Sequence, residues 1–138
     1  MVPSRVFLDT SFLQALINRN DQLHDQAKIL WPQVRLAAEV WLTEAILLEV
    51  GNALCARNRS TTAQFIQECF RTPNMRVVPV DSLLFKRGLQ LYRERLDKTW
   101  SLTDCISFIV MQDQNLKEAV TVDAHFVQAG FRALMRKD

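Results

Sequence analysis

The chain has 138 residues, of which 49% are hydrophobic and 23% are charged, and its formal net charge is +2. This length and apolar content predict one compact domain over residues 1–138, and a net charge so close to zero excludes nucleic-acid binding through overall basicity alone. No apolar run approaches the roughly 20 residues of a membrane span, and no signal-peptide pattern opens the chain. We therefore expect a cytoplasmic protein without a membrane segment, in which Cys55, Cys69 and Cys105 are reduced and buried.

Strand and helix patterns alternate along the chain, with no internal repeat or linker between them. Short runs of β-branched and aromatic residues predict strands at residues 5–9, 40–43, 75–80, 118–123 and, as a last edge strand, 131–135. Apolar residues at helical spacing predict helices at residues 10–18, 21–38 with an interruption at Pro32, 44–57, 61–70, 83–96, from Asp104 onward, and 124–130. This alternation predicts an α/β fold with a mostly parallel sheet and right-handed crossovers.

Two acids stand at predicted strand ends. Asp9 closes the first strand and Asp123 closes the fourth, and functional groups in parallel α/β folds gather at the carboxyl ends of strands. Each acid also precedes a helix, so the structural alternative is that it caps that helix. The functional interpretation predicts that both carboxylates lie at one rim of the sheet.

Glu49 lies in the middle of an apolar helix. Its own face carries Ala45, Ile46, Ala53 and the polar Asn52, and the remaining faces are apolar as well. This pattern predicts a helix that is buried on all sides. An ionised carboxylate there needs an ion-pair partner or a bound cation. We favour a functional site over a buried ion pair, because perturbed acids gather at functional sites.

Asp104 stands at the start of a very apolar helix, in the stretch WSLTDCISFIVM. The structural alternative is that Ser101 or Thr103 caps this helix and that Asp104 complements the helix dipole. Considered alone, Asp104 fits that alternative well. Together with the other three acids, however, Asp104 is a candidate member of a carboxylate cluster.

A parallel sheet can bring all four acids to one rim. Carboxylates so close together repel each other and raise each other's pKa, and Lys98 is the one cation nearby in the sequence. Oxygen ligands without a neighbouring His or Cys cluster suit Mg²⁺ or Mn²⁺. The pattern therefore predicts a metal site made of Asp9, Glu49, Asp104 and Asp123.

Four segments, in this order, resemble the PIN domain family and, within it, the VapC-like single-domain proteins: FLDTSF, TEAILLEVGNAL, WSLTDCISF and VTVDAHFVQAGF. The resemblance spans essentially the whole chain. It implies a three-layer α/β/α sandwich with a short, mostly parallel central sheet, and a metal-dependent endoribonuclease activity. It also implies a homodimer and, because many members are toxins, an antitoxin protein whose amphipathic segment crosses the cleft.

The resemblance assigns metal binding and catalysis to the four acids, which match the four acids of the family in order. Ser11 resembles a hydroxyl residue near the metal, and Thr10 and Thr121 are assigned supporting hydroxyl or backbone contacts. Asn52 matches a polar position one turn after the second acid and is expected to orient Glu49.

The acids and the resemblance together predict hydrolysis of RNA phosphodiester bonds by water, without a covalent protein intermediate. In this hypothesis Asp9, Glu49 and Asp104 hold one divalent ion, and Asp123 completes a second or weaker site. The alternatives are a PIN protein of RNA processing that is not a toxin, and a non-catalytic binding module whose acids hold a structural metal. A phosphatase of the haloacid dehalogenase type needs an acid where this chain has Ser11. A receiver domain needs an acidic pair at the first strand, which this chain lacks.

Several other polar side chains near the acids are expected to have structural roles. His125 is expected to be an exposed helix residue, and Trp100 is expected to pack rather than to stack on a base. Contacts with phosphate are conceivable for four basic residues, but exposed charges are more often solvated. These residues are Arg57, Arg59, Arg95 and Lys98.

Overall fold

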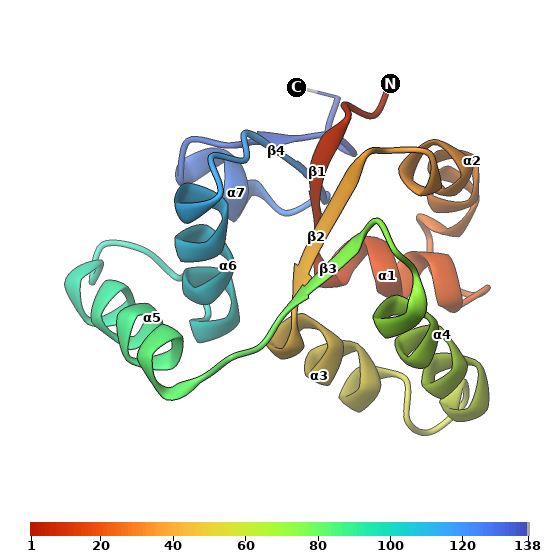
Figure 1. Cartoon of the computed structure of the whole chain (residues 1–138), viewed down its shortest axis with the longest axis horizontal. Coiled ribbons are helices and arrows are strands. Elements are labelled where there is room, and N and C mark those ends of the chain that lie inside the picture. The colour runs from red at the N-terminus through yellow and green to blue at the C-terminus, as the bar shows by residue number, and fades with distance from the viewer. Residues whose placement is uncertain (138) are drawn as a thin grey trace.

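A computed structural model describes residues 1–137. They form a five-stranded sheet, and helices surround it (Figure 1). The strands are β1 (Arg5–Leu8), β2 (Glu39–Thr43), β3 (Met75–Val78), β4 (Glu118–Val120) and β5 (Arg132–Ala133). They lie in the order β3-β2-β1-β4-β5, and every neighbouring pair is parallel. The predicted parallel α/β fold is therefore confirmed, and β5 is the edge strand that the sequence predicts.

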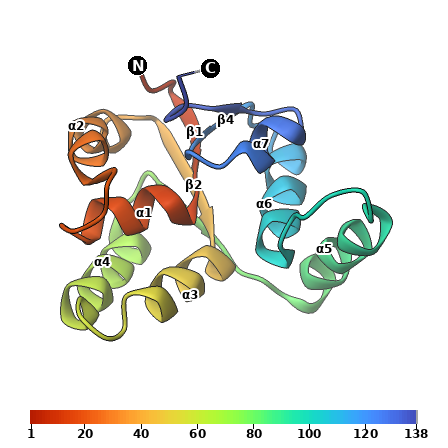
Figure 2. The ribbon, with the colours of Figure 1, turned by 180° about the vertical axis from the view of Figure 1, so that it is seen from behind.

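Helices cover both sides of the sheet (Figures 1 and 2). The helices are α1 (Thr10–Ile17), α2 (His24–Arg35), α3 (Glu44–Ala53), α4 (Arg59–Arg71), α5 (Ser82–Glu94), α6 (Leu102–Asp113) and α7 (Ala124–Gln128). Helices α1, α2 and α4 lie on one side and α6 and α7 on the other, while α5 packs on the outside of α6. This arrangement is the expected three-layer α/β/α sandwich.

The chain changes direction across the sheet between β1 and β4. It first adds β2 and β3 on one side of β1, and then crosses to add β4 and β5 on the other side. In open parallel sheets, the crevice outside the carboxyl ends of the strands at such a reversal is the usual position of a functional site. The residues that follow β1 and β4 therefore lie where a functional site is expected.

An aromatic cluster packs α7 against α6. Phe108 of α6 meets Trp100 and Phe126 edge-on, each with ring centroids 5.0 Å apart. Trp100 is 6% exposed and both phenylalanines are fully buried or nearly so, as expected for residues that supply most of their stabilisation through packing. Trp100 therefore has the packing role that its sequence context predicts.

Several element boundaries differ from the predicted ones for local reasons. Helix α6 begins at Leu102, two residues before the predicted start, because Ser101 caps it. Strand β4 ends at Val120 and not at Asp123, because its partner β1 ends at Leu8, which pairs with Val120, and Asp123 caps α7. Helix α2 continues through Pro32 without ending there.

Helix α3 corrects the expectation of a helix that is buried on all sides. Ile46, Leu47 and Val50 are buried, but Leu48 is 67% exposed and Glu49 is only partly buried. The helix also ends at Ala53 and not at residue 57. A helix whose exposed face is also apolar suggests a surface that meets another molecule.

Two further expectations can be compared with the described residues. Cys69 and Cys105 are buried, but Cys55 is exposed in the turn after α3, so the expectation of three buried thiols is wrong for Cys55. None of the helices within residues 1–137 has the length and apolar character needed to cross a membrane.

Candidate metal centre

Asp9 lies directly after β1 and is nearly inaccessible to solvent. Although it stands at the N-cap position of α1, its side chain does not cap the helix. Its Oδ2 atom instead accepts hydrogen bonds from the hydroxyl of Thr121, at 2.7 Å, and from that of Ser11, at 3.2 Å. The two hydroxyl residues therefore fix the orientation of the carboxylate. The supporting role near a metal that the family resemblance implies for them stays a prediction.

The pKa of Asp9 is raised from 3.8 to about 6. Burial is the largest cause, because removal from water disfavours the charged form. The hydrogen bond from Thr121 lowers the pKa in part, and the negative charges of Asp104 and Asp123 raise it. The pKa of Asp9 therefore responds to the charges of both carboxylates, although these residues are far from Asp9 in the sequence.

Glu49 reaches the same end of the sheet from α3. Its Oε1 atom accepts a hydrogen bond of 2.7 Å from the hydroxyl of Thr10, the residue that follows Asp9. Thr10 therefore connects the second acid with the first. Asn52 is exposed and lines a shallow groove with Leu48, and within the described residues no hydrogen bond joins it to Glu49.

Asp104 combines the two roles that the sequence leaves open. Its Oδ2 atom accepts a hydrogen bond from the backbone N–H of Ser101, and the Ser101 hydroxyl accepts one from the backbone N–H of Asp104. This reciprocal pair is a capping box at the start of α6. Burial raises the pKa of Asp104, and the charge of Asp123 raises it further. The residue caps its helix and also belongs to the acidic cluster.

Asp123 stands at the N-cap position of α7, where its Oδ1 atom accepts a hydrogen bond of 2.9 Å from the backbone N–H of His125. The imidazole of His125 turns back toward the acids. Its Nδ1 atom lies 3.0 Å from Asp104 Oδ2 and 3.3 Å from Asp123 Oδ1. Ligand atoms of these three residues all lie within 4.8 Å of one another.

The position of His125 corrects the expectation of an exposed helix residue and of a site without a nearby histidine. Its side chain is 27% exposed and meets two of the four acids. One sequence signal could have indicated this position: a histidine two residues after a strand-end acid lies in the first turn of the next helix. Of the basic residues considered for phosphate contacts, Arg95 pairs with Asp97 and covers the ring of Trp100, and Lys98 also lies close to Asp97.

The four acids therefore come together to different degrees. Asp104 and Asp123 share one small cluster, Asp9 lies close enough for its pKa to respond to both, and Glu49 joins through Thr10. No ion pair between these acids and a lysine or arginine is found within residues 1–137, whereas His125 pairs with two of the acids.

This donor set fits a divalent cation. The ligands are mainly carboxylate oxygens, which suit Mg²⁺ and Mn²⁺. Burial and mutual repulsion raise the pKa of Asp9 and of Asp104, and a cation between them would offset both effects. The residues thus form a candidate metal site at the reversal point of a parallel sheet.

Comparison with known proteins agrees with this architecture. The family model of the PIN domain matches residues 6–132, and the chain belongs to that family. It is 30% identical over 129 residues to the 23S rRNA-specific endonuclease VapC20 of Mycobacterium tuberculosis, in each of two strains, and the alignment covers 91% of this chain and 95% of the relative. The crystal structure of Mycobacterium tuberculosis VapC20, described as a sarcin-ricin loop cleaving toxin, matches with a TM-score of 0.81 at 28% identity. That match also covers 91% of this chain and 95% of the other.

Proposed function

We propose that this protein is a metal-dependent endoribonuclease that hydrolyses RNA phosphodiester bonds. The observation that carries the proposal is the convergence of acids from four separate segments at the reversal point of the sheet, without a lysine or arginine partner in the described chain. Membership of the PIN domain family and the endonuclease relative support the same activity.

Asp9, Glu49 and Asp104 would hold one Mg²⁺ or Mn²⁺ ion, and Asp123 would complete a second or weaker site. When bound, the cation supplies stabilisation of negative charge on phosphate and a water of lowered pKa. The protein contributes fixed orientation, because hydrogen bonds from the protein hold an oxygen of each acid. Preorganised ligands of this kind avoid reorganisation during the reaction.

The substrate and biological role follow from the relative, whose name specifies 23S rRNA and whose structure is described as that of a toxin. We propose ribosomal RNA as the substrate and a toxin–antitoxin pair as the setting, with both proteins in the cytoplasm. A PIN protein of RNA processing is the alternative. A small reading frame upstream that encodes a DNA-binding pattern, and whose product neutralises this chain, would decide for the toxin.

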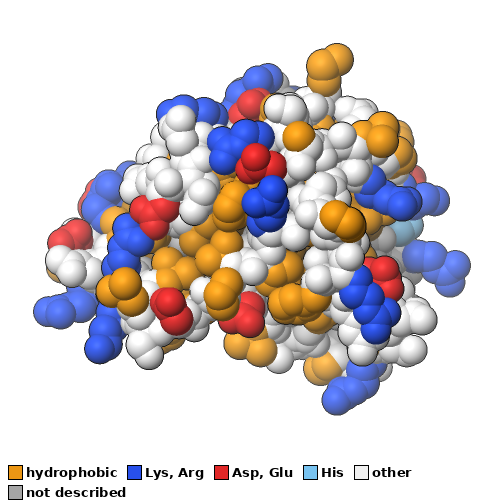
Figure 3. Space-filling model, in the orientation of Figure 1, with side chains coloured by type: hydrophobic (Ala, Val, Ile, Leu, Met, Phe, Trp, Pro, Cys, Tyr) orange, Lys and Arg blue, Asp and Glu red, His pale blue; other side chains and the backbone are white. Residues whose placement is uncertain are grey.

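Two surfaces offer places for protein partners. Hydrophobic side chains gather in a hollow over α6 and β3 (Figure 3), where Val78, Pro79, Leu83 and Val110 line a cavity of about 240 Å³. We assign this face to a second copy of the chain in a homodimer. The rim of the hollow includes Leu83, which is 69% exposed, and burial of such a side chain favours association.

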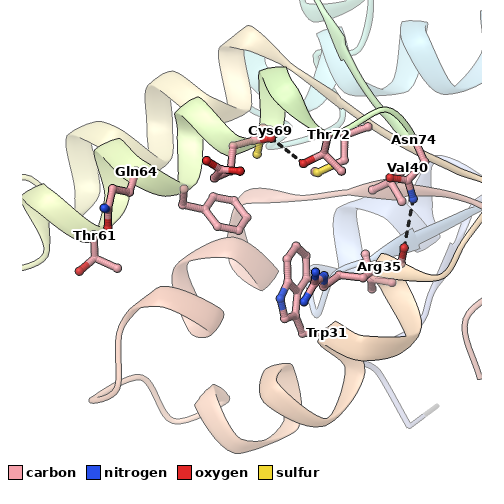
Figure 4. Close-up of a pocket in the computed structure, with 12 residues that line it drawn as sticks. Trp31, Arg35, Val40, Thr61, Gln64, Cys69, Thr72 and Asn74 are labelled. Atoms are coloured by element: carbon pink, nitrogen blue, oxygen red, sulfur yellow. Dashed lines mark hydrogen bonds between the residues drawn. The ribbon is translucent and has the colours of Figure 1, made fainter.

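A groove of about 590 Å³ lies between α2 and α4 (Figure 4). Trp31 and Arg35 of α2 face Gln64 and Cys69 of α4 across it. None of the four acids lines this groove, so it is not the place of the chemistry. We propose it as the seat of an amphipathic antitoxin segment, because its lining combines apolar and polar side chains.

The activity is tested with purified protein, ribosomes and total RNA, with Mn²⁺ or Mg²⁺ and with EDTA. We expect cleavage that requires the metal and that Asp9→Asn abolishes, while Asp25→Asn, an exposed acid of α2, keeps full activity. A protein that binds metal but cleaves no RNA would instead be a binding module. Cleavage that persists in Asp9→Asn would refute the proposed site.

A further inference from the structure

His125 occupies a position that the proposed activity does not by itself explain. We infer that His125 is a positioning residue of the cation site, which sets the separation of Asp104 and Asp123 without itself binding the ion. The inference rests on the proposed function, because it concerns the same metal centre. It assigns a role to a side chain beyond the four acids.

The hydrogen-bond pattern around the imidazole of His125 indicates whether its Nδ1 atom donates or accepts a hydrogen bond. Nδ1 lies 3.0 Å from Asp104 Oδ2 and 3.3 Å from Asp123 Oδ1. Each of these oxygens already accepts a backbone N–H, from Ser101 and from His125 respectively. Ionised carboxylate oxygens only accept hydrogen bonds. Nδ1 therefore carries a hydrogen and donates it between the two acids.

This arrangement uses one oxygen of each acid and leaves the other available. Within the described residues, Asp104 Oδ1 and Asp123 Oδ2 accept no hydrogen bond. The backbone N–H groups and the imidazole thus hold one oxygen of each of two neighbouring carboxylates, which would otherwise repel each other. A cation can then bind the two remaining oxygens without competing with the protein donors.

The imidazole is itself held in place from the other side. Its Nε2 atom lies 3.2 Å from the hydroxyl of Thr99, and a hydroxyl can either donate or accept a hydrogen bond. The next residue, Phe126, is fully buried against Phe108 of α6, while Trp100 donates a hydrogen bond to Gln128 of α7. Partners outside the ligand shell that orient metal ligands commonly affect metal affinity by about 10- to 100-fold.

The test is Mn²⁺ affinity measured by calorimetry without RNA, so that it does not depend on cleavage. His125→Gln places its amide nitrogen near the position of Nε2, whereas His125→Asn places it near Nδ1 and can still donate to the acids. We expect His125→Gln to bind Mn²⁺ about 10-fold more weakly and His125→Asn to retain most of the affinity. A purely structural role would not produce this recovery by the shorter amide.

Pulsed EPR of the Mn²⁺-loaded protein with ¹⁵N-labelled histidine tests direct binding. We expect no directly coordinated imidazole nitrogen, and a nitrogen coupling of a bound imidazole that is lost in His125→Asn would overturn the inference. Equal affinities of the wild type and His125→Gln would also overturn it, as would equal losses in His125→Gln and His125→Asn when circular dichroism shows both folded. A protein that shows the expected affinities but cleaves no RNA would refute the proposed function and leave this inference standing.

Discussion

The carboxyl group of Asp9 lies in surroundings that disfavour its charge, although metal binding requires that charge. Its folded-state pKa of about 6 exceeds the ordinary 3.8, so its contribution to stability is fully present below pH 3.8 and is lost as the pH rises through 6. At neutral pH this ionisation lowers the free energy of unfolding of the metal-free protein by roughly 3 kcal/mol.

Asp9→Asn should therefore stabilise the metal-free protein while it abolishes activity. An amide avoids the burial of a charge and can still accept the hydroxyl hydrogen bonds of Ser11 and Thr121. We expect a higher melting temperature at pH 7.5 and a much smaller gain at pH 4, where the carboxyl group is largely protonated. Thermal denaturation of both proteins in EDTA measures the difference, and Asp25→Asn is the control. A destabilised Asp9→Asn protein at pH 7.5 would contradict this account.

Metal affinity should decrease as the pH falls through about 6. Protons then compete with the cation for Asp9, whose pKa is about 6, and for Asp104, whose pKa burial also raises. Calorimetric titration with Mn²⁺ at pH 7.5, 6 and 5 measures this effect, and proton release on binding should be greatest near pH 6. An affinity independent of pH across this range would show that neither acid is a ligand.

At the scale of elements, α5 and α6 meet through a glycine. A Cβ atom at Gly88 would lie 2.5 Å from Cγ1 of Ile106, two residues after Asp104. We expect Gly88→Ala to reduce the free energy of unfolding by about 1–3 kcal/mol, because the added methyl group overpacks this contact. Urea denaturation measures the change.

Gly51 in α3 provides the matched control for that substitution. A Cβ atom there would meet only Ile66, at an ordinary 3.8 Å, and alanine favours a helix over glycine by up to about 1 kcal/mol. Gly51→Ala should therefore leave stability unchanged or raise it. If both alanine substitutions destabilised the protein equally, the contact with Ile106 would not be the cause of the loss at Gly88.

At the scale of the whole molecule, the hydrophobic hollow over α6 and β3 predicts association. Leu83→Asp places a charge on its rim and should convert the proposed homodimer to a monomer. Leu36→Asp is the control, because Leu36 is also exposed, at 87%, but follows α2 and does not line the hollow. Light scattering coupled to size-exclusion chromatography measures the mass, and a wild-type monomer at all concentrations would contradict the assignment.

The three thiols should report on global unfolding. Cys55 is exposed and should react rapidly with a thiol reagent, whereas burial raises the pKa of Cys69 to about 12 and that of Cys105 to about 11. Thiolates are the reactive form, so we expect one fast thiol per native chain and three in urea. Three fast thiols in the native protein would show that the core around α6 opens readily.

The sequence predicts the order of elements and the four acids because both depend on local chemistry. Asp104 and Glu49 are recognisable as acids among apolar neighbours, and Asp9 as an acid at a strand end. The role of His125 depends on the packing of α7 against α6, which residues distant in the sequence determine. The exposure of Leu48 likewise depends on which elements cover α3, and helical periodicity alone does not contain that information.

The hydrogen bond from Thr121 to Asp9 joins residues 112 positions apart, and this separation has a consequence during protein synthesis. A nascent chain that ends before Thr121 has neither this contact nor Asp123 and His125. The centre is complete only after β4 has been translated and has paired with β1. The order of translation therefore delays the assembly of the proposed metal centre, which an unfinished chain on the ribosome does not contain.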